Sequence, residues 1–183
     1  GKKARAEVQE ALQKSLTETL HLLGALKQWL VLVAETQVVP IAQLVLDLMK
    51  LEQPLLARHA SDVLFNLFVR RGGGVEPRAV GLLLAQVVSV LEGWDQRDAD
   101  TVTSLLHVVE GGLTRLCNAD MGVALQCLPR AVHSIAPLVA CESEGIRFAA
   151  AETLKRLLHA AMTEEVVGEA CSGQGNTASA VGL

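Results

Sequence analysis

Apolar residues recur every three to four positions along almost the whole chain, which is the spacing of one face of an α-helix. The pattern also repeats over a longer distance. When Leu56–Phe68 is shifted by ninety positions, it falls on Ile146–Leu158, and apolar residues meet apolar residues. Half of that shift sets Ala60, Leu64 and Phe68 on Leu105, Val109 and Leu113. A unit of about 45 residues that cannot bury its own apolar face must stack against similar units.

This repeat predicts an all-α fold, an α-solenoid of HEAT/armadillo-like helix pairs. We expect about seven helices, over residues 15–36, 40–53, 54–71, 76–91, 98–116, 120–139 and 143–162. They would be part of a longer array, and a compact helical bundle is the alternative. No alternating strand pattern competes. The longest uncharged run, Val80–Leu91, is shorter than the roughly 18 residues that a membrane span needs.

Prolines and small polar residues mark the expected helix ends. Ser15 or Thr17 can cap the first helix, because a side-chain oxygen there accepts a bond from an unpaired backbone N–H. Pro40 and Pro54 suit the first turn of the second and third helices, where the missing N–H is not needed. Pro129 lies inside the sixth helix and is expected to kink it.

The fifth helix carries a glycine pair in its interior. Asp98 or Asp100 can cap this helix. Gly111 and Gly112 each cost about 1 kcal/mol relative to alanine. The sequence therefore predicts that a neighbouring helix approaches closely at this point, and a local kink is the alternative.

The apolar stripes predict which side chains point inward. On the third helix, His59 falls on the stripe and is expected to be a core histidine that has its hydrogen bonds. The expected inward set of the second, third and seventh helices is Ile41, Leu44, Val45, Leu48, Leu51, Leu55, Leu56, His59, Ala60, Val63, Leu64, Leu67, Phe68, Ile146, Phe148, Ala150, Leu154, Leu157 and Leu158.

The chain divides into three parts by composition. Residues 1–14 are expected to be a polar helical extension, and 15–167 the HEAT-like repeat segment. Residues 168–183 are mostly small or polar and cannot bury enough surface to fold alone, so they are expected to be a flexible Gly/Ser-rich tail or linker.

Charge and aromatic content argue against independent nucleic-acid binding. The chain has 16 Lys plus Arg against 20 Asp plus Glu, a net charge of −4, whereas a protein that neutralises many phosphates is normally basic. Aromatic residues make up 3% and tyrosine is absent, so the flat rings on which bases stack are scarce.

The chain also lacks a recognisable catalytic group. The five histidines lie inside expected helices, and no two have the spacing of metal ligands. The four cysteines have no CxxC spacing and are expected to be reduced thiols that pack between helices. Cys127 and His133 are six positions apart, which does not put them on one helix face. We expect no enzyme activity, no metal and no cofactor.

Two basic pairs are the candidate contacts for a partner or for phosphates. Arg70 and Arg71 lie at a helix end before a glycine run, and Lys155 and Arg156 lie on the polar face of the last helix. In a solenoid, such edges and concave faces bind partners. An ordinary solvated helix surface is the alternative for each pair.

One segment resembles the HEAT consensus. Ile135–Val139, a short acidic link and Gly145–Leu154 follow its order: a first helix ending in Pro-x-Leu, an acidic turn and a second helix opening Val-Arg-x-x-Ala-x-x-x-Leu. Small alanines let the paired helices approach, and leucines fill the space between stacked units.

Several short motifs, in their order along the chain, resemble the ribosomal RNA-processing protein twelve family. The members of this family are large eukaryotic HEAT-repeat proteins of the nucleolus. The resemblance covers about residues 15 to 165. The resemblance rests on four motifs: Thr17–Leu23 with Leu26 and Lys27, the Pro54–Leu56 helix with Val63, Leu64, Leu67 and Phe68, the Val80–Leu91 helix, and Cys127–Arg130.

This resemblance implies a non-catalytic scaffold in ribosome biogenesis, located in the nucleolus and nucleus. It implies binding to pre-ribosomal particle proteins, with rRNA as a further candidate, and support of rRNA processing and subunit export. The protein would be one subunit of a large complex, with no membrane and no small-molecule substrate among its partners. An importin-β-like transport receptor, or another HEAT-repeat protein-interaction module, is the alternative function.

Overall fold

The computed structural model describes residues 2–51, 53–70 and 75–172, with side chains for all of these except 2, 3, 35, 70 and 163–172. Within them the chain forms α1 (Lys2–Trp29), α2 (Glu35–Lys50), α3 (Pro54–Phe65), α4 (Pro77–Leu91), α5 (Ala99–Ala119), α6 (Met121–Ile135) and α7 (Glu144–Ser172), and no strand. Shorter helical turns are η1 (Leu30–Leu32), the π-helical η2 (Asn66–Arg70), η3 (Trp94–Gln96) and η4 (Ala136–Ala140).

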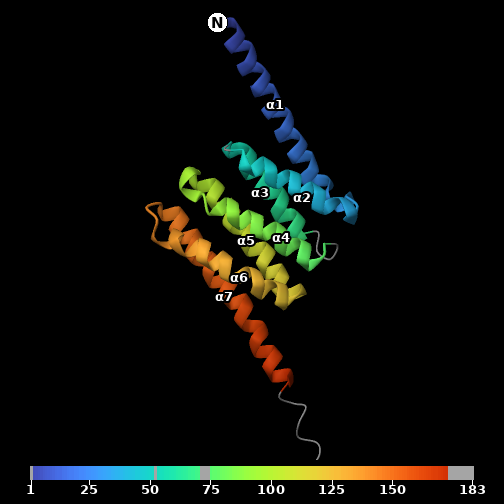
Figure 1. Ribbon diagram of the computed structural model, residues 1–183, viewed down its shortest axis with the longest axis vertical. Coiled ribbons are helices and arrows are strands. Elements are labelled where there is room, and N and C mark those ends of the chain that lie inside the picture. The colour runs from blue at the N-terminus through green and yellow to red at the C-terminus, as the bar shows by residue number, and fades with distance from the viewer. Residues whose placement is uncertain (1, 52, 71–74, 173–183) are drawn as a thin grey trace, which may run out of the picture.

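The helices stack in two layers (Figure 1). In one layer α1, α3, α5 and α7 pack side by side in that order, and in the other α2, α4 and α6 do the same. Across the layers α2 packs on α3, α4 on α5, and α6 with η4 on α7. Each helix therefore touches its own pair and the neighbouring pairs. This is the arrangement of an α-solenoid, so the predicted fold class is confirmed.

Positions related by the ninety-residue shift are largely equivalent in the core. Leu56 and Ile146 are both buried, and Ala60 and Ala150 are both completely inaccessible. The alanines let α3 and α7 approach their neighbours, because a larger side chain would hold the helices apart. The repeat read from the sequence is thus a repeat of packing.

The first two helices begin earlier than predicted. α1 runs unbroken from Lys2, and Thr17 Oγ1 bonds the Gln13 carbonyl at 2.9 Å inside the helix, so neither Ser15 nor Thr17 is a cap. The preceding residues are good helix formers and continue the helix. α2 begins at Glu35, with Pro40 inside it. A proline in the second turn removes one backbone hydrogen bond and leaves the rest of the helix intact.

The predicted inward faces of α2, α3 and α7 are partly wrong. Leu44, Leu51, Leu55, Phe148 and Leu158 are 44–70% exposed where the sequence stripe predicted burial. His59 is also exposed, so it is not a core histidine. The buried face of α2 instead consists of Val38, Ala42, Val45, Leu46 and Met49.

The fifth helix is continuous and shows why it carries two glycines. A Cβ at Gly111 would lie 2.6 Å from Val69 Cγ2, and one at Gly112 would lie 2.6 Å from Leu84 Cδ2. Close approach of neighbouring side chains is therefore confirmed. Asp98 is the N-cap, and its carboxylate accepts the Thr101 N–H at 3.1 Å.

The sixth helix ends before its predicted limit. α6 continues through Pro129 and stops at Ile135. Pro137 falls in the following 3-10 turn η4, where a proline in the first turn is tolerated.

Both outer helices extend past the stacked layers (Figure 1). The side chains of residues 4–15 on α1 are exposed, including Val8 and Leu12, which are 60% and 66% accessible. α7 likewise continues well beyond the middle of the stack, to Ser172. The central helices α4 and α5 have neighbours on both sides. The candidate site lies on these helices, on the turn between them and on the turn between α2 and α3.

Candidate functional site

The four basic residues proposed from the sequence lie at two places. Arg70 is the last residue of η2, but its side chain and the whole of Arg71 lie outside the described residues. Lys155 and Arg156 are neighbours on α7. The Lys155 Nζ lies 3.6 Å from Glu152 Oε1, and its side chain is 76% exposed. Contact of these four residues with a partner stays a prediction.

Ion pairs join neighbouring helices of the α1–α3–α5–α7 layer. Each connects residues that are 35 to 46 positions apart in the sequence. The pairs are Lys27 with Asp62 at 2.7 Å, Arg58 with Asp100 at 2.9 Å, and Arg156 with Glu110 at 2.9 Å. The hydrogen bond to Glu110 raises the pKa of the Arg156 guanidinium. Arg156 therefore fixes α7 against α5, a role that sequence reasoning missed.

Polar contacts also join the helices of the other layer. The amides of Gln43 on α2 and Gln86 on α4 donate to each other at 3.0 and 2.9 Å. Arg130 on α6 donates two hydrogen bonds to the Glu92 carboxylate, and the Ser134 hydroxyl donates a third. The bond from Arg130 lowers the pKa of Glu92, although burial acts in the opposite direction.

Three arginines hold backbone carbonyls that would otherwise be unpaired at helix ends or turns. Sequence reasoning gave none of them this role. Arg97 and Arg115 stand alone, and Arg147 entered only as the arginine of the HEAT-like segment Gly145–Leu154. Arg97 donates to the carbonyl of Met49, Arg115 to those of Phe68 and Val75, and Arg147 to those of Cys141 and Glu142. Burial lowers the pKa of Arg115.

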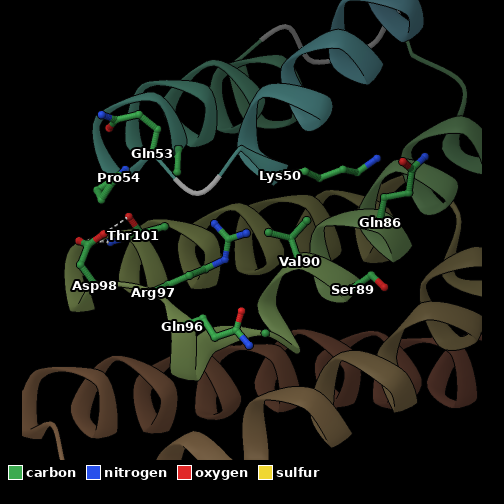
Figure 2. A pocket seen from close by; sticks show the side chains of 12 residues that line it. Lys50, Gln53, Pro54, Gln86, Ser89, Val90, Gln96, Arg97, Asp98 and Thr101 are labelled. Atoms are coloured by element: carbon green, nitrogen blue, oxygen red, sulfur yellow. Dashed lines mark hydrogen bonds between the residues drawn. The ribbon is translucent and has the colours of Figure 1, made fainter. Parts of the chain in front are cut away.

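A cavity of about 440 Å³ opens between the α2–α3 turn and the α4–α5 turn (Figure 2). Figure 2 shows the Arg97 guanidinium between Thr101 and Val90, while Lys50 runs toward Gln86 on the other side. The α2–α3 turn and the α4–α5 turn are brought together because consecutive helix pairs stack in register. The cavity is therefore a product of the repeat.

The described residues hold no candidate metal site and no disulfide. No group of three His, Cys, Asp or Glu side chains among them could hold a metal ion. No disulfide joins Cys117, Cys127 and Cys141, the cysteines that the structure describes. Burial raises the pKa of Cys127, which disfavours the reactive thiolate.

One helical segment within the described residues, Met121–Ala140, is long and apolar enough to cross a membrane by length and composition. In this structure it packs against α4 and α5, and its Arg130 is paired with Glu92. Length and composition alone do not make this helix a membrane span.

These features define a class: an α-solenoid of HEAT-like helix pairs with polar contacts at the repeat junctions. Solenoids of this class are typically non-catalytic. A comparison with protein families is more specific. Residues 2–75 match the family described as "RRP12-like, N-terminal HEAT repeats".

This match confirms the resemblance that the sequence motifs indicated. It also includes residues 2–14, which those motifs did not cover. The matched region contains α1, α2, α3 and η2. From residue 76 to 165 the resemblance stays a prediction. No curated protein and no solved structure matched the chain.

Proposed function

We propose that this chain is a non-catalytic HEAT-repeat scaffold in ribosome biogenesis. The match of residues 2–75 to the RRP12-like N-terminal HEAT repeats carries the proposal. The stacked pairs give an extended surface built from rigid helices, which suits a protein that holds several partners in place. The expected partners are proteins of pre-ribosomal particles, with rRNA as a further candidate, and the expected location is the nucleolus and nucleus.

Co-sedimentation tests this function. The tagged full-length protein should sediment in a sucrose gradient with pre-ribosomal particles, and its depletion should delay rRNA processing and subunit export. The fluorescent fusion should accumulate in the nucleolus. A protein that stays at the top of the gradient under conditions where known particle proteins sediment would overturn the proposal.

The basic pairs are the proposed contacts on this scaffold. Lys155 is suitable for a test because its only described ion pair is with Glu152 on its own helix. K155Q should preserve folding and weaken particle association, as should R70Q/R71Q. Unchanged association for both variants would show that these basic edges are solvated surface.

An importin-β-like receptor is the alternative, and stacked helix pairs are what favours it. A receptor of that kind would bind its small GTPase in the GTP-loaded form. Direct binding in a pull-down, with no sedimentation in the particle fractions, would replace the scaffold by this alternative.

A further inference from the structure

Two side chains that can only donate hydrogen bonds, Arg97 and Lys50, line the α2–α3/α4–α5 cavity. Arg97 uses one guanidinium nitrogen on the Met49 carbonyl, at 3.1 Å, and has further N–H groups. Gln53 accepts the Leu55 N–H with its Oε1 at 3.0 Å, which leaves its amide NH₂ as a donor. Lys50 adds an ammonium group that is 52% exposed and lies 2.8 Å from Asp47 Oδ1 on its own helix.

The one carboxylate that lines the cavity already has partners. Asp98 accepts the Thr101 N–H with one oxygen, at 3.1 Å, and the Thr101 hydroxyl with the other, at 2.5 Å. Burial raises the pKa of Asp98, but these hydrogen bonds together outweigh it and hold the pKa below its ordinary value. Asp98 is thus an ionised helix cap whose two oxygens are bonded by Thr101.

The floor of the cavity is apolar. Ala57 and Val90 are 1% and 8% exposed, and Pro54 stands beside them. A ligand that fits must offer hydrogen-bond acceptors to the rim and apolar atoms to the floor. An acidic side chain next to an aliphatic one, on an extended peptide, has both.

We propose that this cavity binds an acidic segment of a partner protein, with a side-chain carboxylate held between Arg97 and Lys50. A guanidinium fork and an ammonium group form charge-assisted hydrogen bonds with a carboxylate. The aliphatic neighbour of that residue lies on Ala57 and Val90. The Gln53 amide NH₂ bonds a carbonyl of the peptide backbone. The site deepens the scaffold role, on which it rests for the presence of a protein partner.

The surroundings favour a peptide over an RNA strand. The chain has a net charge of −4, and Asp47 and Asp100 stand close to the cavity as partners of Lys50 and Arg58. A run of phosphates would meet both carboxylates, whereas a single carboxylate between Arg97 and Lys50 competes only with Asp47 for the Lys50 ammonium. The described residues that line the cavity also include no aromatic ring on which a base could stack.

Peptide titration tests the site. The 183-residue chain is titrated into fluorescein-labelled pentapeptides with a central glutamate or glutamine between two leucines, and into a decameric uridine RNA, and anisotropy is recorded. The glutamate peptide should bind at least about tenfold more tightly than the glutamine peptide, since the charge-assisted contacts to Arg97 and Lys50 are lost. Equal affinity of the two peptides, or tighter binding of the RNA, would overturn the proposal.

Variants locate the binding. K50Q and R97Q should each weaken the glutamate peptide about five- to tenfold. K50Q removes only an exposed pair within α2, so it keeps the test valid if R97Q disturbs folding. The matched control is K14Q, since Lys14 forms a comparable exposed pair with Glu18 on α1, away from the cavity. Loss of affinity in K14Q, or none in K50Q, contradicts the assignment.

The two proposals fail separately. If full-length K50Q and the wild-type protein co-sediment with particles equally and the peptide titration shows no preference, the cavity proposal fails and the scaffold stands. If the wild-type chain prefers the glutamate peptide but the full-length protein does not sediment with particles, the ribosomal function fails and the peptide site stands.

Discussion

Gln43 on α2 and Gln86 on α4 form a reciprocal amide pair, each donating its NH₂ to the carbonyl oxygen of the other. The two residues are 43 positions apart, which is close to the repeat length. The NH₂ group and the carbonyl oxygen of each amide both have a partner only when α2 and α4 are aligned in one way. The pair therefore fixes the register between two consecutive repeats.

Breaking this pair should destabilise the stack. In Q43A the part-buried Gln86 amide loses its partner, and we expect a cost of about 1 kcal/mol in the free energy of unfolding, measured by urea denaturation. Q43A/Q86A should cost less than the sum of the single variants, because no orphaned amide is left. Q126A, on the exposed side of α6, is the control and should be near neutral. Strict additivity would argue against a coupled pair.

The helical glycines should respond in opposite directions to alanine. At Gly112 the new Cβ meets Leu84, which is 1% exposed and cannot move aside. We expect G112A to lose stability, since overpacking costs about 1–3 kcal/mol and offsets the gain in helix propensity. No neighbouring atom lies within 4 Å of the position at Gly24, so G24A should gain about 0.5–1 kcal/mol. Equal thermal melting of the two variants would refute this account.

Leucines of the two central helices differ sharply in what they contribute to stability. Leu105 on α5 is completely buried, and L105A should cost about 2–5 kcal/mol through lost burial and the cavity left behind. Leu82 on α4 is 71% exposed, and L82A should change stability by less than about 0.5 kcal/mol. Chemical denaturation measures both, and a costly L82A would mean that this face is covered in solution.

Acid should remove the stabilisation supplied by Glu92. Its pKa in the folded chain lies below the ordinary value of 4.5, so the contribution is complete above that value and is lost as the pH falls through the folded pKa. At pH 7, E92Q should be less stable by about 0.2–1 kcal/mol, the range of exposed ion pairs. The difference should vanish at low pH in urea titrations. R130Q should reproduce this pH dependence, and a difference that persists in acid would assign the effect to something other than charge.

The sequence predicted the central helices better than the outer ones, for a physical reason. The apolar spacing also predicts inward stripes on α4 and α5, and every residue of them is buried: Val80, Leu83, Leu84, Val87, Leu91, Val102, Leu105, Leu106, Val109, Leu113 and Leu116. These helices have neighbours on both sides and a partner in the other layer, so almost any apolar position is covered. On α7 a periodic stripe does not tell which part of it a neighbour reaches, and Phe148 remains 70% exposed.

The cavity and the junction contacts could not be predicted in the same way. Arg97 and Lys50 come from turns of different repeats, and only stacking brings them together. A signal was nevertheless present. The junction pairs of Arg58 with Asp100 and Arg156 with Glu110 are separated by 42 and 46 residues, so the repeat length itself points to complementary side chains one unit apart.

The ion pairs between successive helices are not the same at every junction. Going from α1 to α3 the cation is on the earlier helix, and the same holds from α3 to α5, but from α5 to α7 the order reverses and Glu110 faces Arg156. A repeat moved to or from the α5–α7 junction would meet a side chain of the wrong sign. The units share one fold but are not interchangeable. A stack made by duplicating or reordering repeats would need matching changes of the charged side chains at the helix junctions.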